Sequence, residues 1–281
     1  MKSAWQIASA TDHTRNDPNK DMSPQTQFLD VTADGRPARK VAYMTSPGSG
    51  KDAPGLVWLS GFKSDMVSTK ASALAVWAEG RGVPYLRFDY GGHGQSDGRI
   101  EDFTIGDWLR DCEACFDRLT GGPQVVIGSS MGGWLALLLA RSLIARGEGG
   151  RLRAMVLIAP AWDMTEELMW KQFTPEAKAV LARDGVFYRP SEYGEPYALT
   201  RALIEEGRNH LLGGSGFDPG CPLRILQGLR DPDVPWEHAL KLVELLGNED
   251  VRLTLVKDAE HRLSRDQDLA LLYSMITEFI P

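Results

Sequence analysis

Short apolar runs alternate along this chain with longer segments whose apolar residues recur at helical spacing. The short runs are typical of buried strands, and the longer segments are typical of helices that cover a sheet. The predicted strands are 55–61, 84–90, 124–130, 154–161, 223–229 and 252–258, after a strand pair at 27–32 and 36–45. The predicted helices are 68–80, 104–119, 131–145, 235–246 and 267–280.

This alternation predicts an α/β fold, with a mostly parallel central sheet that carries helices on both faces. One interval breaks the alternation, because the segment between the strands near 154–161 and 223–229 is too long for a simple crossover. We expect a small helical cap there, over the edge of the sheet where parallel strands end and ligands bind. Its short helical patterns are 165–173, 175–182 and 195–207.

The length and composition fit one domain. The chain has 281 residues, of which 43% are hydrophobic, and this is enough for one large core. Residues 1–24 are mostly polar, so we expect a loosely held N-terminal arm there. We expect a single domain over residues 25–281, with the cap at about 163–220.

Charge and cysteine usage narrow the class of protein. The 31 Lys and Arg residues face 38 Asp and Glu residues, a net charge of -7, which argues against a nucleic-acid partner. No apolar run approaches the roughly 20 residues of a membrane span, and the N-terminus lacks the apolar core of a signal peptide. The 3 cysteines imply no disulfide framework. We therefore expect a cytoplasmic protein with no stable membrane insertion.

Two cysteines, Cys112 and Cys115, form a C-x-x-C pair. Both fall on the apolar stripe of the predicted helix 104–119, so we interpret them as small core residues rather than as metal or redox ligands. No other part of the sequence indicates a bound group. We expect neither a metal nor an organic cofactor.

The segment VVIGSSMGGW, residues 125–134, joins a predicted strand to a predicted helix and contains two adjacent serines. In a nucleophile elbow, the serine occupies a turn so tight that the residues two positions before and after it must be small. Ser130 meets this requirement with Gly128 and Gly132, whereas the same positions around Ser129 hold bulky residues. Ser130 is therefore the predicted nucleophile.

A serine hydroxyl needs a base to activate it, and in this fold the base comes late in the chain, after the nucleophile and an acid. Two of the five histidines, His13 and His93, precede Ser130, and two others lie in the predicted cap or on a predicted helix. His261 remains, in the loop after the predicted strand 252–258. It is the predicted base.

The acid that orients this base is predicted in the turn after the strand 223–229. The spacing G-x-x-D-x-x-V-P there singles out Asp231, and we interpret Asp233 as a capping carboxylate for the next helix. Asp258 and Glu260 lie very near His261 in the sequence and are less favoured alternatives.

An oxyanion hole needs two backbone N–H groups close to the nucleophile. One is expected from Met131, directly after Ser130, and the other from Phe62, in the loop after the predicted strand 55–61. Trp162 lies just past another strand and is a candidate for an acyl pocket. The Gly-rich loop 89–98 contains no dinucleotide-binding motif, and we interpret it as a structural turn.

With this order of nucleophile, acid and base, the chain resembles the α/β-hydrolase superfamily over nearly its whole length after the arm. It is similar, more narrowly, to the family of mitochondrial acyl-protein thioesterase, also known as mycophenolic acid acyl-glucuronide esterase, and its bacterial relatives. The similar segments are 60–71, 87–98, 121–134, 221–236 and 257–264. The resemblance implies Ser130, Asp231 and His261 as a triad, a small helical cap, and hydrolysis of acyl esters or thioesters. It further implies S-acylated proteins or acyl glucuronides among the substrates.

The N-terminal arm departs from that family, because Asp12 and Asp17 do not fit an acidic-poor transit peptide. We therefore expect a bacterial cytoplasmic enzyme that acts on small-molecule acyl esters or thioesters, with S-acylated protein as a further possible partner. A peptidase or a carbon–carbon bond hydrolase on the same fold remains an alternative, since fold does not fix substrate. A non-catalytic ligand receptor is a less favoured alternative.

Overall fold

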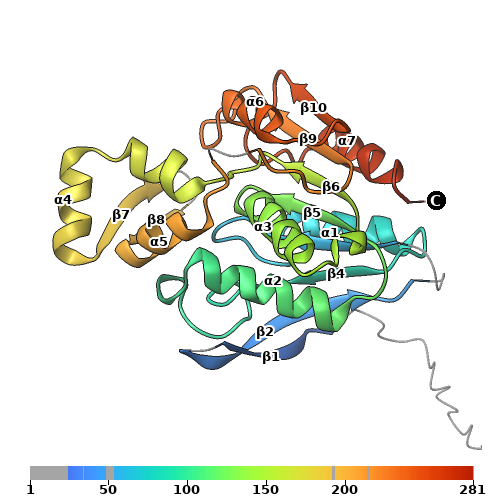
Figure 1. Cartoon of the computed structure of the whole chain (residues 1–281), viewed down its shortest axis with the longest axis horizontal. Coiled ribbons are helices and arrows are strands. Elements are labelled where there is room, and N and C mark those ends of the chain that lie inside the picture. Colours follow the sequence, from blue (N-terminus) through green and yellow to red (C-terminus); the bar gives the residue numbers. More distant parts are fainter. Residues whose placement is uncertain (1–24, 34, 49–53, 192–193, 214–215, 281) are drawn as a thin grey trace, which may run out of the picture.

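The computed structural model describes residues 25–33, 35–48, 54–191, 194–213 and 216–280, so the predicted N-terminal arm at 1–24 lies outside it. Within the described residues, an eight-stranded sheet runs in the order β1-β2-β4-β3-β5-β6-β9-β10 (Figure 1). Its strands are β1 Gln27–Ala33, β2 Arg36–Ser46, β3 Gly55–Leu59, β4 Tyr85–Phe88, β5 Gln124–Ser129, β6 Leu152–Ile158, β9 Leu223–Gly228 and β10 Val251–Val256. β1 and β2 form an antiparallel edge, and the strands from β4 to β10 are parallel. The predicted mostly parallel sheet is confirmed.

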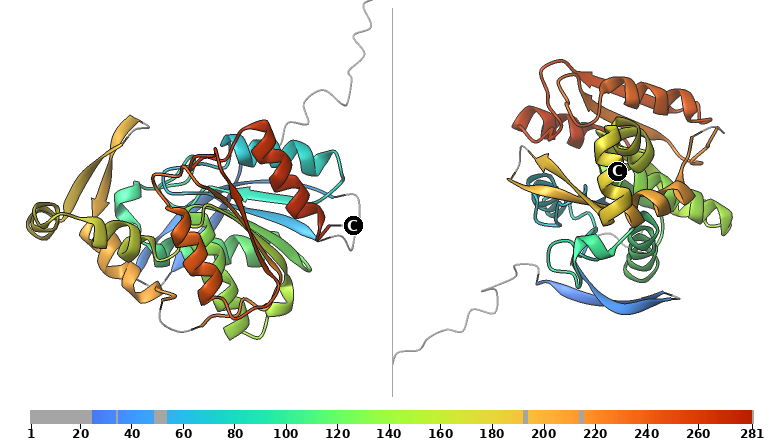
Figure 2. Two further views of the ribbon diagram at one scale, coloured as in Figure 1. Left: turned by 90° about the horizontal axis from the view of Figure 1, so that it is seen from above. Right: turned by 90° about the vertical axis from the view of Figure 1, so that its left-hand side faces the viewer.

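Helices cover both faces of this sheet, as Figures 1 and 2 show. Their bounds are α1 Thr69–Glu79, α2 Ile105–Leu119, α3 Met131–Ala145, α6 Trp236–Leu245 and α7 Asp266–Thr277. The core cluster on one face includes apolar residues of α2, α3 and α6, and the cluster on the other face includes those of α1 and α7. In β5, Val126 belongs to the first cluster and Val125 and Ile127 to the second. A strand buried on both faces reads as a continuous apolar run, which is why the sequence pattern located it.

The sequence indicates both the N-terminus of the helix α2 and the face that it buries. Thr104 and Asp107 form a capping box at its N-terminus, which satisfies backbone N–H groups that have no partner inside the helix. Cys112 and Cys115 lie on its buried face, with 1% and 0% of their surface exposed. Burial raises the pKa of both thiols well above the ordinary value, so neither is a reactive thiolate.

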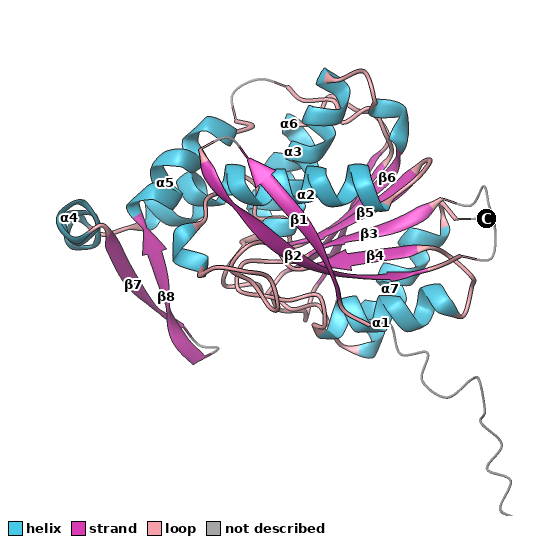
Figure 3. Cartoon of the chain, turned by 90° about the horizontal axis from the view of Figure 1, so that it is seen from below, coloured by secondary structure: helices cyan, strands magenta, loops and turns pink. Residues whose placement is uncertain are grey.

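The segment between β6 and β9 forms a separate lobe at one end of the sheet, on the left of Figures 1 and 3. Its elements are a π-helical turn Thr165–Met169, a 3-10 turn Trp170–Gln172, α4 Pro175–Asp184, β7 Val186–Ser191, β8 Gly194–Thr200, α5 Arg201–Gly207 and a 3-10 turn Arg208–His210. β7 and β8 pair as an antiparallel hairpin. The interval predicted as an insertion is therefore a lobe of mixed helices and strands.

The purely helical pattern predicted over 195–207 is wrong in its first half, which is the strand β8. Residues up to Thr200 pair with β7, which places Phe187 opposite Leu199, and the helix starts only after Thr200, whose side chain caps it by accepting the N–H of Leu203. Gly185 ends α4 with a φ of 76°, a left-handed conformation that glycine adopts without strain, and the chain turns there into β7.

Candidate active site

Ser130 occupies the sharp turn between β5 and α3, with φ 54° and ψ -119°. This conformation is strained for a residue with a side chain, and it is the geometry expected of a nucleophile elbow. A side chain at Gly128 would collide with the backbone of Gly132, and one at Gly132 would collide with the carbonyl of Leu59. Both positions therefore need glycine because the backbones approach closely. This is the same steric argument that singled out Ser130 in the sequence.

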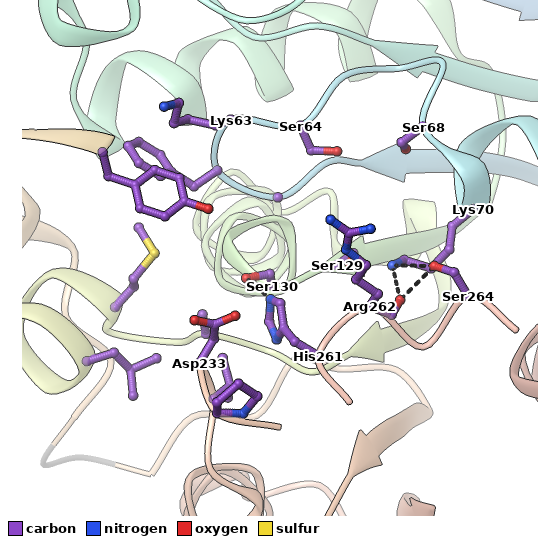
Figure 4. A pocket seen from close by; sticks show the side chains of 18 of the residues that line it. Lys63, Ser64, Ser68, Lys70, Ser129, Ser130, Asp233, His261, Arg262 and Ser264 are labelled. Carbon is purple, nitrogen blue, oxygen red and sulfur yellow. Dashed lines mark hydrogen bonds between the residues drawn. The ribbon is translucent and has the colours of Figure 1, made fainter. Parts of the chain in front are cut away.

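His261 lies next to Ser130 in the loop after β10 (Figure 4). Its Nε2 atom is 3.2 Å from Ser130 Oγ, and its Nδ1 atom is 2.8 Å from Asp231 Oδ2. A carboxylate can only accept a hydrogen bond, so the proton belongs on Nδ1, and Nε2 is left with the lone pair that can take the serine proton. The three residues come from the ends of three parallel strands.

Asp231 is held at four points. Its Oδ1 atom accepts the backbone N–H groups of Asp233 and Val234, each at 2.9 Å, and its Oδ2 atom accepts from Gln227 Nε2 at 3.2 Å as well as from His261. Its side chain is fully buried. This carboxylate therefore fixes the orientation of the imidazole ring without freedom of its own.

Asp233 does not cap α6 as the sequence predicted. The residue at the start of that helix is Pro235, which makes no side-chain capping bond, and Asp233 instead lines the cavity beside His261. The capping interpretation failed because Asp231 organises this turn: its carboxylate accepts the backbone N–H groups of Asp233 and Val234.

Trp162 also lies elsewhere than predicted. It stacks on His238, with 4.7 Å between ring centroids, and its Nε1 donates to the backbone oxygen of His238 at 3.0 Å. It is 7% exposed and is not among the residues that line the cavity, whereas its neighbours Ala161 and Met164 are. Trp162 thus holds β6 to α6 beneath the site.

The loop after β3 brings Phe62 to the nucleophile. A side chain at Gly61 would stand 3.3 Å from Ser130 Cβ, so the two backbones nearly touch. The N–H of Met131, at the start of α3, has no acceptor inside its own helix. The backbone N–H groups of Phe62 and Met131 are therefore candidates for the oxyanion hole, as predicted.

His93 is a functional candidate that sequence reasoning missed. It is 3% exposed, and its Nε2 atom accepts the backbone N–H of Lys63 at 3.1 Å, while its Nδ1 faces the oxygen of Gly91 at 3.3 Å. Burial lowers its pKa to about 4, so the ring is neutral and Nε2 can accept. Lys63 is in the left-handed region with φ 58°, so His93 secures a strained residue next to Phe62. One sequence signal could have pointed to His93: it lies in the loop after β4, the strand that pairs with β3.

A cavity of about 680 Å³ opens at Ser130 and has two different ends (Figure 4). The apolar end lies toward the cap and is lined mainly by Phe62, Met164, Leu168, Met169, Tyr197 and Leu199, and the cap side also holds Lys63 and Arg189. The polar end lies toward α1 and is lined by Ser64, Ser68, Thr69, Lys70, Arg262 and Ser264. Ser130 and His261 lie between the two ends.

Among the described residues, Asp231, Asp233 and His261 form the one group with metal-ligand chemistry, their ligand atoms lying within 4.8 Å of one another. Asp231 and His261 already bind each other, which leaves Asp233 as a lone ligand. In the part of the chain that the structure describes, no helix has the length and apolar character to cross a membrane.

Comparison with known proteins places this site in a family. Residues 56–202 match the family described as serine aminopeptidase, S33. Palmitoyl-protein thioesterase ABHD10, mitochondrial, of Homo sapiens is 36% identical over 229 residues, which cover 81% of this chain and 73% of that protein. The Bos taurus protein of the same name is 35% identical over 231 residues, with the same coverage. The chain belongs to both the S33 and the ABHD10 families.

Solved structures agree with this membership. A putative hydrolase from Agrobacterium vitis S4 superposes on the ABHD10-family chain with a TM-score of 0.88 and 43% identity, covering 92% of this chain and 99% of the other. Alpha/beta hydrolase domain-containing protein 10 from mouse gives 0.78 and 31%, with 90% and 97% covered. The predicted α/β-hydrolase fold, the predicted resemblance and the class of serine hydrolase acting on ester or thioester bonds are confirmed.

Proposed function

We propose that this ABHD10-family chain is an acyl thioesterase and esterase in which Ser130 is the nucleophile, His261 the base and Asp231 the group that orients it. The observation that carries the proposal is the continuous row of contacts from Ser130 Oγ through both ring nitrogens of His261 to Asp231, at 3.2 and 2.8 Å. The strained turn at Ser130 supports it, because such strain is typical of functional residues.

The reaction follows from this geometry in two halves. Ser130 Oγ attacks the acyl carbonyl while His261 Nε2 takes its proton, and the oxyanion receives hydrogen bonds from the backbone N–H groups of Phe62 and Met131. The carbonyl re-forms, the bond to the thiol or alcohol breaks, and the imidazolium returns the proton to that leaving group. Water then repeats the sequence on the acyl-enzyme, which releases the carboxylic acid and restores Ser130.

The proposed substrates are S-acylated proteins, together with smaller acyl esters such as acyl glucuronides. The curated relatives are named palmitoyl-protein thioesterases, and the apolar end of the cavity offers an acyl chain aliphatic, thioether and aromatic contacts. An aminopeptidase, as the S33 description names, would need a carboxylate for the substrate's ammonium group. Asp233 beside His261 is the residue that favours this second candidate.

Purified protein should hydrolyse S-acyl thioesters and p-nitrophenyl esters across a series from short to long acyl chains, and Ser130→Ala should lower kcat by about 10⁴-fold or more. The reason is that the attacking oxygen is lost while the fold remains. Circular dichroism of the variant checks the fold. An Ala variant that keeps more than a tenth of the activity contradicts the assignment, and turnover of aminoacyl p-nitroanilides in preference to thioesters would favour the peptidase.

We propose the cytoplasm as the location, because Asp12 and Asp17 do not fit an acidic-poor transit peptide. The curated relatives carry the word mitochondrial in their names. Subcellular fractionation of the native host, with an antibody against this chain, tests the location directly.

A further inference from the structure

The polar end of the cavity carries several hydrogen-bond donors. Lys70 and Arg262 bring two cationic side chains, and Ser64, Ser68 and Ser264 bring hydroxyl groups. In Figure 4, Ser68, Lys70, Arg262 and Ser264 lie on one side of Ser130 and His261, and Lys63 and Asp233 lie on the other. If the acyl chain occupies the apolar end, the leaving group must extend toward these donors.

Lys70 is placed where a cation is costly. It is the second residue of α1, where the helix dipole disfavours positive charge, and its Nζ donates to the backbone oxygen of Arg262 and to Ser264 Oγ. Burial, then the charge of Arg262, lowers the pKa of Lys70 to about 8, against the attraction of Asp268 and Asp231. Among the described residues, no carboxylate lies within ion-pair distance of its ammonium group. An anion bound here would supply the missing counter-charge.

Ser68 supplies an independent sign of a missing ligand. It is the residue at the N-terminus of α1 and makes no side-chain capping bond. Its Oγ atom is buried, and no partner for it exists in the described part of the chain. Buried hydroxyl groups are normally hydrogen-bonded, and this one borders the polar end of the cavity.

We propose that the polar end is a subsite for a carboxylate carried by the leaving group of the acyl substrate, held by Lys70, Arg262 and Ser68. This rests on the proposed function and names its substrate class: a thiol or alcohol with a negative charge close to the scissile bond. In an S-acylated protein, that charge would be an acidic residue beside the modified cysteine. Two carboxylates, those of Asp65 and Asp233, also line the cavity. Asp65 accepts the backbone N–H of Val67 at 3.0 Å, and Asp233 lies on the other side of His261 from Lys70 (Figure 4).

The test uses two substrates that differ only in charge, S-octanoyl-3-mercaptopropionate and its uncharged amide. The wild-type protein should prefer the carboxylate by about tenfold in kcat/KM, mainly through KM, because a charge-assisted hydrogen bond forms only with the anion. In Lys70→Met the ratio should fall toward one, and in Lys70→Arg much of it should return. Lys63→Met, a lysine at the cap side of the same cavity, is the matched control and should leave the ratio unchanged.

The pH dependence of this preference gives a second readout. The preference of the wild-type protein for the carboxylate should decline above about pH 8, as Lys70 loses its proton, and Lys70→Arg should retain its preference to higher pH. A purely structural Lys70 would alter both substrates alike. Equal hydrolysis of both substrates by the wild-type protein overturns the subsite and leaves the proposed function standing. Absence of Ser130-dependent hydrolysis of either one overturns the proposed function itself.

A final pair of substrates identifies the source of the carboxylate. The two substrates are S-octanoyl peptides with Glu or Gln next to the acylated cysteine. The wild-type protein should hydrolyse the Glu peptide with the higher kcat/KM, and Lys70→Met should lose this preference. A preference seen with the mercaptopropionate pair alone supports the subsite and assigns it to small-molecule leaving groups.

Discussion

At the scale of single residues, the proposed chemistry depends on which hydrogen-bonding role each atom can take. Asp231 separates two tasks, because Oδ1 closes the turn after β9 while Oδ2 faces His261. The first task needs only an acceptor, and the second needs an acceptor whose partner is the protonated Nδ1. A substitution that keeps the first and reverses the second therefore isolates the orientation of the base.

Asp231→Asn is that substitution. Its amide oxygen can still accept from Asp233 and Val234, but its NH₂ group would face His261 Nδ1 and hold the ring in the wrong tautomer. We expect kcat to fall by about 10⁴-fold with little loss of stability. Kinetics with a neutral ester, together with thermal unfolding, measures both quantities. A loss of activity that merely follows a loss of folded protein would contradict this interpretation.

Ser130, Asp231 and His261, which the structure brings together, could be located from motif spacing and chain order. Gly128 and Gly132 bracket Ser130, and the order along the chain leaves His261 as the base. His93 could not be found this way, since its role lies in one bond to Lys63, 30 residues away. Asp233 was misread for the same reason, because the capping pattern is local and the turn geometry is not.

At the scale of elements, two loops from neighbouring strands build the oxyanion side of the site. The loop after β3 carries Phe62, and the loop after β4 carries His93, whose ring meets the rings of Phe62 and Trp108 edge to face at 6.2 and 5.2 Å. The strands of the sheet and the helices that cover it were predictable, because buried strands are short apolar runs and the helices repeat apolar residues at helical spacing. The hairpin β7–β8 was not, because an isolated pair of strands in a lobe leaves a short, mixed pattern.

His93→Phe should keep the aromatic packing and remove the acceptor for the N–H of Lys63. We expect kcat to fall by about 10- to 100-fold with KM nearly constant, because the loop that presents the N–H of Phe62 loses its anchor. His93→Gln, whose side-chain oxygen can accept, should recover part of the rate. Steady-state kinetics on the three proteins decides. If Gln and Phe behave alike, the ring acts through packing alone.

At the scale of the whole molecule, buried neutral histidines make the fold sensitive to acid. The pKa of His93 is lowered to about 4 in the folded chain, below the ordinary value of 6.5, and burial also lowers the pKa of His238. Between these pH values, the unfolded chain binds a proton that the folded chain does not. The free energy of unfolding therefore decreases as the pH falls from about 6.5 toward 4.

For His93 alone, this decrease amounts to about 3 kcal/mol over the full window. Urea unfolding of the wild-type protein and of His93→Phe at pH 7 and pH 4.5 should show a smaller acid loss in the variant. His238 stays in both proteins and cancels in the comparison. An identical acid loss in the two proteins would mean that His93 is already protonated in the fold.

The crowded backbone around the elbow separates what can change in this enzyme from what cannot. A methyl group added at Gly132 or Gly128 would meet carbonyl groups, and one added at Gly133 would stand 2.9 Å from Pro160 Cβ. Substitutions at these three glycines would therefore disrupt the elbow, in natural variants and in engineered ones. The cap and the start of α1 supply several residues of the cavity wall, and none of these is a glycine. New selectivity can therefore be acquired by exchanging those surfaces around an unchanged catalytic centre.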